Sequence, residues 1–439
     1  MQEEESIAKH GGERVALALR AHGVRFLFTL CGGHISPILA ASKALGIRIV
    51  DVRDEATAVF AADAAARLTG VPGVAAVTAG PGLRNTIPAL TRAQLAQSPV
   101  ILLGGAAPTA LQGRGALQDI DQRSLIAPHV KLVRRIRRVS DLVPALEEAF
   151  EVSREGVQGP VFIECPVDLL YDEASIRQWY ADAAGKGSSI PDRLLRFYLN
   201  RHVEKMFTGA SEAVAPVARE VMRPEPADAT VEAAAKALAR ATHPLMVIGS
   251  QSLAVASHAP LIAGAVAKAG IPAYLSGMAR GLLGREHRLQ MRHQRRQALR
   301  ESDCVVLAGV PCDFRLDYGK HVRRSSTLIA ATRGAREARM TRRPDIAAIG
   351  DAGLFLERVV ERLGAAGTKW MDWTAQLRAR DAAREAEIDG EAAHAGEFVN
   401  PVALLRAIDR AASERAVLVA DGGDFVATAS YIVLPRGPL

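Results

Sequence analysis

The segment VRFLFTLCGGHISPILAASKALGIRIVDVRDEATAVFAADAAARLTG (residues 24–70) alternates apolar strand-like runs with helix-like runs. VRFLFTLCGG predicts a strand that ends in paired glycines, and IRIVDV predicts a second strand. SPILAASKALG and DEATAVFAADAAARLTG predict helices, each closed by a glycine. Continuous apolar strands separated by helices are typical of a parallel sheet covered on both faces. The segment therefore predicts an α/β fold.

The same alternation extends in both directions and predicts a first domain at residues 1–170. The helix-like run SIAKHGGERVALALRAHG precedes the first strand. VPGVAAVTAGPG, PVILLGGAAP and GPVFIECPVDLL predict three further strands. After residue 170 the periodicity weakens, and residues 171–228 are predicted to form a helical linker segment.

A second α/β domain is predicted at residues 229–363, with the strands PLMVIGS, IPAYLS, DCVVLAG, STLIAAT and DIAAIG. A connector helix follows at residues 364–394. Residues 395–439 are predicted to begin a third α/β unit without completing it. Within them, AVLVADGGDF (residues 416–425) predicts a buried strand that runs into a glycine-rich loop.

The composition limits which classes of protein this chain can belong to. Of the 439 residues, 49% are hydrophobic, and 55 basic residues against 48 acidic ones give a formal net charge of +7. Such a chain buries a core and is globular rather than disordered. The basic residues are scattered, so we expect no nucleic-acid partner. For the densest basic cluster, KLVRRIRRVS (residues 131–140), two interpretations stay open: a solvated face of a strand or helix, or a contact to a coenzyme phosphate.

Several features predict a cytoplasmic protein. The start MQEEES (residues 1–6) has no apolar core and is not typical of a secretory signal. No run of eighteen apolar residues occurs, so we expect no membrane partner. The four cysteines show no zinc or redox spacing and are expected to be free thiols: Cys31, Cys165, Cys304 and Cys312.

Glu55 is the first candidate for chemistry. It stands two residues beyond IRIVDV, where a helix is predicted to begin. A carboxylate there is favoured by the helix dipole, which is one explanation for it. The other is that Glu55 hydrogen-bonds a buried ligand, because ligands of parallel sheets bind at the carboxyl ends of the strands.

Glycine-rich loops follow two of the predicted strands. CGGHI (residues 31–35) and TAGPGLRN (residues 78–85) would let backbone approach a planar ligand, although a tight turn is the commoner explanation for either loop. Neither is a nucleotide fingerprint or a P-loop. His34 is either an acid/base group beside the first loop or a histidine satisfied by backbone. GALQDIDQRS (residues 115–124) supplies polar side chains for a pocket or forms a capped loop.

Together these segments resemble one family. The succession CGGHISPIL, DVRDEATAVFAADAAARLTG, TAGPGLRNTIPAL and SPVILLGGAAP…GALQDID resembles the pyrimidine-binding domain of thiamine-diphosphate enzymes of the acetolactate synthase, oxalyl-CoA decarboxylase and 2-hydroxyacyl-CoA lyase group. GSQSL, GMARGLLGREH, LAGVPCDFRLDYG and DGGDFVATA are similar to the acetolactate-synthase-like 2-hydroxyacyl-CoA lyases. The resemblance covers essentially the whole chain. It implies a pyrimidine-binding domain, a Rossmann-like central domain and only the start of a diphosphate-binding domain.

The resemblance also implies roles for individual residues. Thiamine diphosphate acts as an electron sink once its thiazolium ring loses a proton. Glu55 would promote that loss through a hydrogen bond to the aminopyrimidine. Leu117 stands where acetolactate synthases carry phenylalanine, which puts pyruvate-ligating specificity in doubt. The other implied site residues are Gly32 and Gly33 beside the reacting centre, Gly82 and Asn85 beside the pyrimidine, and Gln118.

Members of the family hold the diphosphate through Mg2+ on a Gly-Asp-Gly motif followed by Asn, which is absent from this sequence. No metal ligand is therefore predicted in the chain. The resemblance places Gly423, Asp424 and Phe425 beside the diphosphate, where we expect main-chain contact. It also implies FAD or a CoA or ADP moiety in the central domain, and Arg280 is a candidate phosphate contact there.

The resulting hypothesis is a thiamine-diphosphate-dependent lyase or carboligase that acts on a 2-hydroxyacyl-CoA or a 2-keto acid. We expect it to be incomplete without a diphosphate- and Mg2+-binding domain, which is a separate chain or was lost by truncation. The expected protein partner is such a separate chain or further copies in a homo-oligomer. The alternatives are an acetolactate synthase large-subunit activity in branched-chain amino-acid biosynthesis and a non-catalytic, nucleotide-binding remnant.

Overall fold

The computed structural model describes residues 10–185, 187, 189–212, 215–364, 369–420 and 422–437. The acidic start at residues 1–6 lies outside these ranges, as does Asp421 within AVLVADGGDF. The chain divides into two compact units, Met1–Met222 and Arg223–Leu439. Each unit is described by itself.

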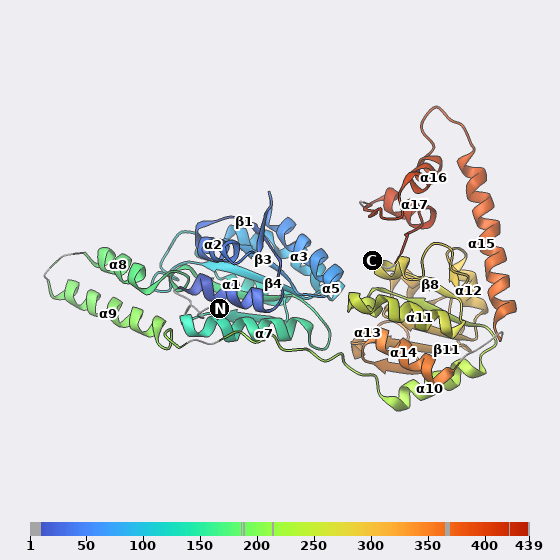
Figure 1. The fold of residues 1–439 in the computed structure, drawn as a ribbon, viewed down its shortest axis with the longest axis horizontal. Coiled ribbons are helices and arrows are strands. Elements are labelled where there is room, and N and C mark those ends of the chain that lie inside the picture. Colours follow the sequence, from blue (N-terminus) through green and yellow to red (C-terminus); the bar gives the residue numbers. More distant parts are fainter. Residues whose placement is uncertain are drawn as a thin grey trace, which may run out of the picture. The chain divides into compact units, whose positions relative to one another are not determined.

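The first unit is built on a parallel six-stranded sheet in the order β2-β1-β3-β4-β6-β5 (Figure 1). Five of these strands were predicted, and the sixth, the edge strand β5, lies within the basic cluster KLVRRIRRVS. The strands are β1 Phe26–Leu30, β2 Arg48–Asp51, β3 Gly73–Val77, β4 Val100–Ala106, β5 Leu132–Arg135 and β6 Val161–Pro166. The helices are α1 Gly11–Ala21, α2 Ser36–Ala44, α3 Glu55–Thr69, α4 Pro81–Asn85, α5 Ile87–Ala96, α6 Gln122–Ile126 and α7 Leu142–Arg154.

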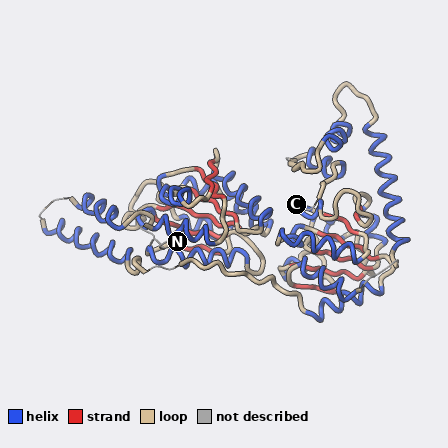
Figure 2. Tube along the Cα trace, viewed as in Figure 1, coloured by secondary structure: helices blue, strands red, loops and turns tan. Residues whose placement is uncertain are grey.

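Helices cover both faces of this sheet (Figure 2). Val74 and Ala76 of β3 pack with residues of α1, α2 and α7, whereas Ala75 and Val77 of the same strand pack with α3 and α5. Successive side chains of a strand point to opposite faces. The continuous apolar runs in the sequence are therefore explained by burial of both faces.

The helices α8 Glu173–Ala184 and α9 Ile190–Phe207 form a hairpin that belongs to the first unit. α9 begins at a capping box made by Ser189 and Asp192. Residues 215–227, which follow, contain no helix or strand.

The second unit contains another parallel six-stranded sheet, in the order β12-β11-β10-β7-β8-β9. One face packs on α10, α11 and α14, and the other packs on α12 and α15. The strands are β7 Pro244–Ile248, β8 Ala273–Leu275, β9 Gln290–Met291, β10 Cys304–Ala308, β11 Thr327–Thr332 and β12 Ile346–Ile349. The helices are α10 Asp228–Arg240, α11 Ala259–Ala269, α12 Arg295–Glu301, α13 Ala335–Ala338, α14 Ala352–Leu363, α15 Met371–Ala392, α16 Pro401–Ala411 and α17 Asp424–Ile432.

The predicted buried strand in AVLVADGGDF is wrong. Residues 416–420 form no strand, and the side chains of Val417 and Val419 are 88% and 92% exposed. A strand needs a neighbour to pair its backbone N–H and C=O groups. No strand among the described residues pairs with this segment. The apolar run therefore stays solvent-exposed and irregular.

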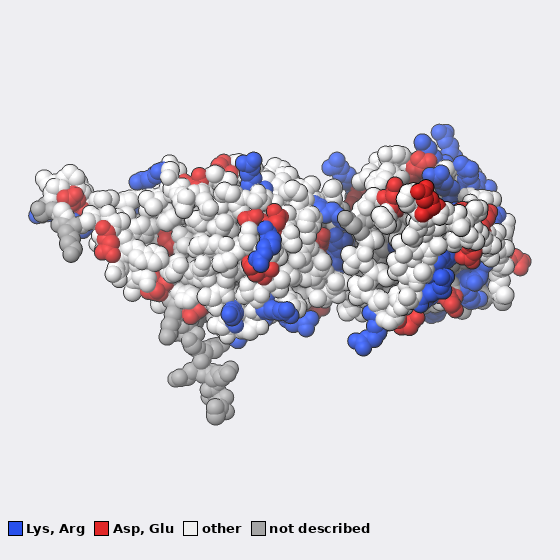
Figure 3. Space-filling model, turned by 90° about the horizontal axis from the view of Figure 1, so that it is seen from above, with Lys and Arg blue, Asp and Glu red and all other residues white. Residues whose placement is uncertain are grey.

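The α/β fold class is confirmed by the two parallel sheets. Within the described part of the chain, no helix combines the length and apolar character needed to cross a lipid bilayer. On the face drawn in Figure 3, Lys and Arg side chains lie among Asp and Glu side chains rather than in one continuous patch.

Candidate functional site

Two neighbouring acids at the start of α3 do different things. The Asp54 carboxylate is the N-cap and accepts hydrogen bonds from the backbone N–H groups of Ala56 and Thr57 at 2.8 and 3.4 Å. Glu55 makes no cap. Its side chain is buried, with the residue 7% exposed, and Oε2 accepts a hydrogen bond from Asn85 Nδ2 at 3.0 Å. Asp54 thus supplies the cap, whereas Glu55 is the acidic residue in the first turn of α3 and its carboxylate is held by Asn85.

Gly82 keeps the other oxygen of that carboxylate approachable. A Cβ at Gly82 would lie 3.2 Å from Glu55 Oε1 and 2.8 Å from Thr78 Cγ2. Gly82 and Asn85 both belong to α4, which follows β3. Any side chain at Gly82 would fill the space beside the carboxylate.

Thr78, the first residue after β3, connects the remaining predicted residues. His34 Nδ1 lies 3.1 Å from Thr78 Oγ1, and that hydroxyl lies 3.5 Å from Gln118 Oε1. A Cβ at Gly32 would lie 2.5 Å from Thr78 Cβ, so only glycine allows this approach. Thr78 was not among the predicted site residues. Its position directly after a buried strand was the available signal.

His34 stands on a short turn beside Gly33. Burial lowers the pKa of the His34 imidazole, so its neutral form is favoured. A Cβ on Gly105 would lie 2.4 Å from the His34 Cβ, so the end of β4 meets the first glycine loop directly. A Cβ on Gly33 would meet no atom within 4 Å, so Gly33 borders open space.

Gln122 joins three strand ends beneath the loops. Its Oε1 accepts a hydrogen bond from Gly80 N at 3.0 Å. Its Nε2 donates to Gly105 O and to Glu164 Oε1, both at 3.0 Å. Gln122 is 2% exposed, and sequence reasoning missed its role because it stood in GALQDIDQRS as one polar residue among several.

Gln118 sits in a left-handed backbone conformation, with φ +61°. A Cβ on Gly80 would lie 2.6 Å from the Gln118 carbonyl oxygen, so the two loops are in close contact. A cavity of about 300 Å³ lies beside this region and is lined in part by Gln122, Glu164 and Arg135. Arg135 Nε lies 3.3 Å from Glu164 Oε2.

The structure thus brings all the predicted site residues of the first unit to the side of the sheet where the strands have their carboxyl ends. The C-terminal candidates belong to the second unit. Gly423, with φ +82°, precedes α17, Asp424 is the first residue of that helix, and Phe425 is 67% exposed.

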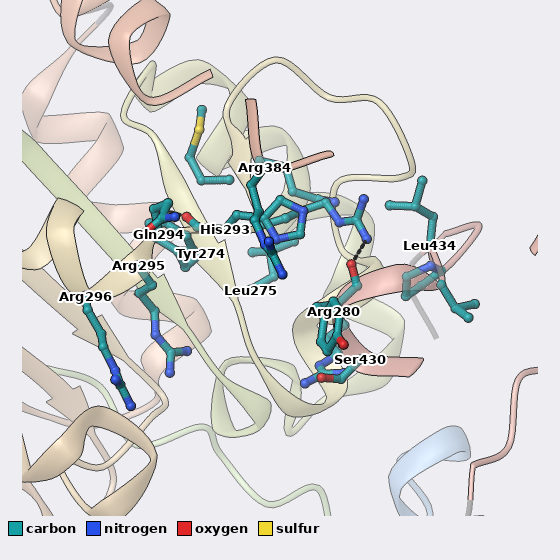
Figure 4. Close-up of a pocket in the computed structure, with 16 residues that line it drawn as sticks. Tyr274, Leu275, Arg280, His293, Gln294, Arg295, Arg296, Arg384, Ser430 and Leu434 are labelled. Carbon is teal, nitrogen blue, oxygen red and sulfur yellow. Dashed lines mark hydrogen bonds between the residues drawn. The ribbon is translucent and has the colours of Figure 1, made fainter. Parts of the chain in front are cut away.

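Arg280 lies on a second cavity, in the second unit, of about 450 Å³ (Figure 4). Burial lowers the pKa of the Arg280 guanidinium. The segment after β9 meets α17 at this cavity, where Arg292 donates a hydrogen bond to the Tyr431 carbonyl oxygen at 2.6 Å. Five arginines line the cavity: Arg280, Arg292, Arg295, Arg296 and Arg384.

No group of three or more His, Cys, Asp or Glu side chains within the described ranges is arranged to hold a metal ion.

Comparison with known protein families matches two parts of the chain. Residues 9–125 match the family described as thiamine pyrophosphate enzyme, N-terminal TPP binding domain. Residues 231–359 match thiamine pyrophosphate enzyme, central domain. The first match contains every predicted site residue of the first unit, and the second contains Arg280.

Curated relatives match nearly the full chain. It is 46% identical to human 2-hydroxyacyl-CoA lyase 2 over 98% of this chain and 69% of the relative. It is 44% identical to the Caenorhabditis elegans 2-hydroxyacyl-CoA lyase 2, over 100% of this chain and 69% of the relative. It is 30% identical to the acetolactate synthase large subunit IlvG of Mycobacterium tuberculosis, over 97% and 71%.

Proposed function

Because the chain belongs to the thiamine pyrophosphate enzyme family, we propose that it is part of a lyase or carboligase that cleaves or forms a C–C bond of a 2-hydroxyacyl-CoA. The observation that carries the proposal is the buried Glu55 carboxylate. One of its oxygens is held by Asn85, and the other faces the space that Gly82 leaves beside it.

The residues present fit the aminopyrimidine half of thiamine diphosphate. A buried carboxylate beside a glycine offers a hydrogen-bond acceptor that a flat ring can reach. When bound, the cofactor supplies an electron sink for the carbanion that C–C cleavage leaves behind. Glu55 would hold a proton at the ring nitrogen, and Asn85 would keep its carboxylate in place.

Thr78 supports the roles proposed for its neighbours. His34, in its neutral form, would accept a proton beside the first glycine loop and could then return it. Gln118, on the loop that contacts Gly80, would bind the substrate carbonyl through its side-chain amide. Gly32 and Gly33 would leave room for the reacting atoms.

We further propose that Gly423, Asp424 and Phe425 contact the diphosphate through their main chain. They stand at the start of α17, and a helix N-terminus favours an anionic group. Mg2+ with a diphosphate needs oxygen ligands, and we assign none of them to this chain. A separate diphosphate-domain chain would supply them.

The Arg280 cavity is the proposed place for the central-domain ligand, either FAD or a CoA or ADP moiety. Its five arginines and its volume of about 450 Å³ suit a phosphorylated molecule of that size. The proposed location is the cytoplasm, since all four cysteines are free thiols, as expected in a reducing compartment.

A second candidate is acetolactate synthase activity on pyruvate. The relative from Mycobacterium tuberculosis supports it at 30% identity. The higher identity to the 2-hydroxyacyl-CoA lyases favours the first candidate. The third, a non-catalytic remnant that binds a nucleotide, would retain only the Arg280 cavity.

The test mixes the chain with thiamine diphosphate, Mg2+ and a 2-hydroxyacyl-CoA, with and without a fragment of the human relative that carries the part outside the match. We expect an aldehyde and formyl-CoA when the fragment is present. The variant Glu55→Gln should lower turnover by about 10²–10⁴-fold, because the proton at the ring nitrogen is no longer held.

Glu173→Gln is the matched control. Glu173 also follows an aspartate N-cap at a helix start, but its carboxylate pairs with Arg177 and is 44% exposed. Unchanged turnover in Glu55→Gln would refute the role of that residue. Acetolactate from pyruvate, without cleavage of the acyl-CoA, would favour the second candidate.

A further inference from the structure

The arginines in and after β5 fall into two classes. Arg134 forms two hydrogen bonds to the Glu148 carboxylate, at 2.5 and 2.6 Å. Arg135 pairs with Glu164. The side chains of Arg137 and Arg138 make no hydrogen bond or ion pair with any described residue. Two of the four arginines in the basic cluster are therefore neutralised by a carboxylate, and two are not.

Arg137 and Arg138 line a cavity of about 420 Å³ in the first unit, formed with the C-terminal half of α9. From α9, Lys205 reaches it as a third cation without an ion-pair partner in the described part of the chain. Ser140 Oγ donates to the Thr208 carbonyl oxygen at 3.1 Å and joins the loop after β5 to the end of α9. The lining residues are Arg137, Arg138, His202, Lys205, Met206 and Thr208.

A hydrogen bond to Thr109, which is itself bonded to Asp168, orients the His202 ring that lines this cavity. Its Nε2 lies 2.7 Å from Thr109 Oγ1, and that hydroxyl donates its single proton to Asp168 Oδ2 at 2.5 Å. Donation from the imidazole Nε2 to Thr109 Oγ1 would complete this chain of hydrogen bonds. Asp168 is 2% exposed and also accepts from Tyr180 OH at 2.7 Å. A buried carboxylate thus fixes the ring that borders the cavity.

Nearby acidic groups do not neutralise the cavity. The Glu204 carboxylate pairs with Arg201 at 3.5 Å, and Asp168 lies beneath Thr109 rather than in the lining. Three cations without a counter-charge repel one another, and an anion between them removes that repulsion. Arg137, Arg138 and Lys205 are exposed to solvent, and all three line the same hollow.

We propose that this cavity binds a phosphate monoester carried by a ligand of nucleotide size. The two arginines offer planar, multiple donors that match phosphate oxygens, and Lys205 adds a point charge. The volume is in the range of small-molecule pockets. The site is separate from Glu55 and from the Arg280 cavity, and it stands whether or not the lyase proposal holds.

The test is calorimetry of the full chain with inorganic phosphate, 5′-ADP and 3′,5′-ADP as probes. We expect saturable binding of a nucleotide that weakens at least about tenfold in the double variant Arg137→Gln/Arg138→Gln. Arg134→Gln is the matched control, because that arginine is already paired with Glu148, and it should bind like the original chain. The variant Arg280→Gln, tested in the same way, shows how much of the nucleotide binding belongs to the cavity of the second unit.

Nucleotide affinity that is unchanged in the double variant would overturn the proposal, and so would an equal loss in Arg134→Gln. Equal affinities for inorganic phosphate and the nucleotides would also overturn it, because only the phosphate would then be recognised. Preference for 3′,5′-ADP over 5′-ADP would identify the ribose 3′-phosphate as the recognised group. Thermal unfolding of each variant checks that the exposed substitutions leave the fold intact.

Discussion

At the scale of residues, the site depends on the different contacts that the adjacent acids Asp54 and Glu55 make. Asp54 accepts hydrogen bonds from the backbone N–H groups at the start of α3, so Glu55 is not needed as the cap. The buried Glu55 carboxylate then has one partner, Asn85, and one approachable oxygen. Both residues are acidic and stand side by side in the sequence, so only their contacts distinguish them.

These different contacts predict different consequences for the two substitutions. Asp54→Ala should lower the free energy of unfolding by about 1 kcal/mol, because two backbone N–H groups lose their acceptor. Glu55→Gln should change it by less than about 0.5 kcal/mol, because the amide oxygen can still accept from Asn85. Urea unfolding of the two variants measures the difference, and an equal loss in both would contradict it.

At the scale of elements, the site depends on loops tied to one another at the ends of parallel strands. Gln122 connects the loop after β3 with β4 and β6 through three hydrogen bonds. The Gly80 loop that it holds leads directly into Gly82 beside Glu55. The position of Gly82 is thus fixed by an amide from α6, on another part of the chain.

Gln122→Leu should therefore destabilise the first unit by at least about 1–3 kcal/mol, because buried backbone and carboxylate groups lose their partners. Hydrogen exchange at the Gly80 amide should become faster. Gln112→Leu is the control, because Gln112 lines the same cavity with a single bond, to the Ala107 carbonyl oxygen at 2.9 Å. If both variants unfold at the same urea concentration, Gln122 does not hold the strand ends together.

At the scale of the whole molecule, each unit has its own sheet and its own buried core. Residues 215–227 join them without helix or strand. Residues 217–220 of this segment are exposed, and exposed segments without helix or strand are where proteases cut folded chains. The organisation therefore predicts that the units are separable.

Brief trypsin treatment should cut first after Arg219, which is exposed in this segment. We expect two fragments that resist further digestion and keep their secondary structure by circular dichroism, because each retains a complete core. Mass spectrometry identifies the cut. Cleavage inside either sheet before Arg219 would argue against two independent units.

Much of the fold could be predicted because buried parallel strands leave continuous apolar runs. The strands missed, β5 and β9, lie at sheet edges. Two of the four residues of β5 are arginines, and β9 spans only two residues. The site was predicted through Glu55 and the glycine loops, but Thr78 and Gln122 were missed. A hydroxyl and an amide in loops carry no periodic signal, and their importance comes from neighbours distant in sequence.

The sequence by itself determined the α/β class, the family and the candidates around Glu55, because apolar periodicity and motif order are local properties. Only the tertiary structure decided which acid caps α3, which arginines stay unpaired and whether AVLVADGGDF forms a strand. The contact of Glu55 with Asn85, the ion pairs of the arginines and the pairing of a strand each depend on a partner from another part of the chain. A strand-like run without a neighbouring strand stays irregular, since its backbone groups have nothing to pair with but water.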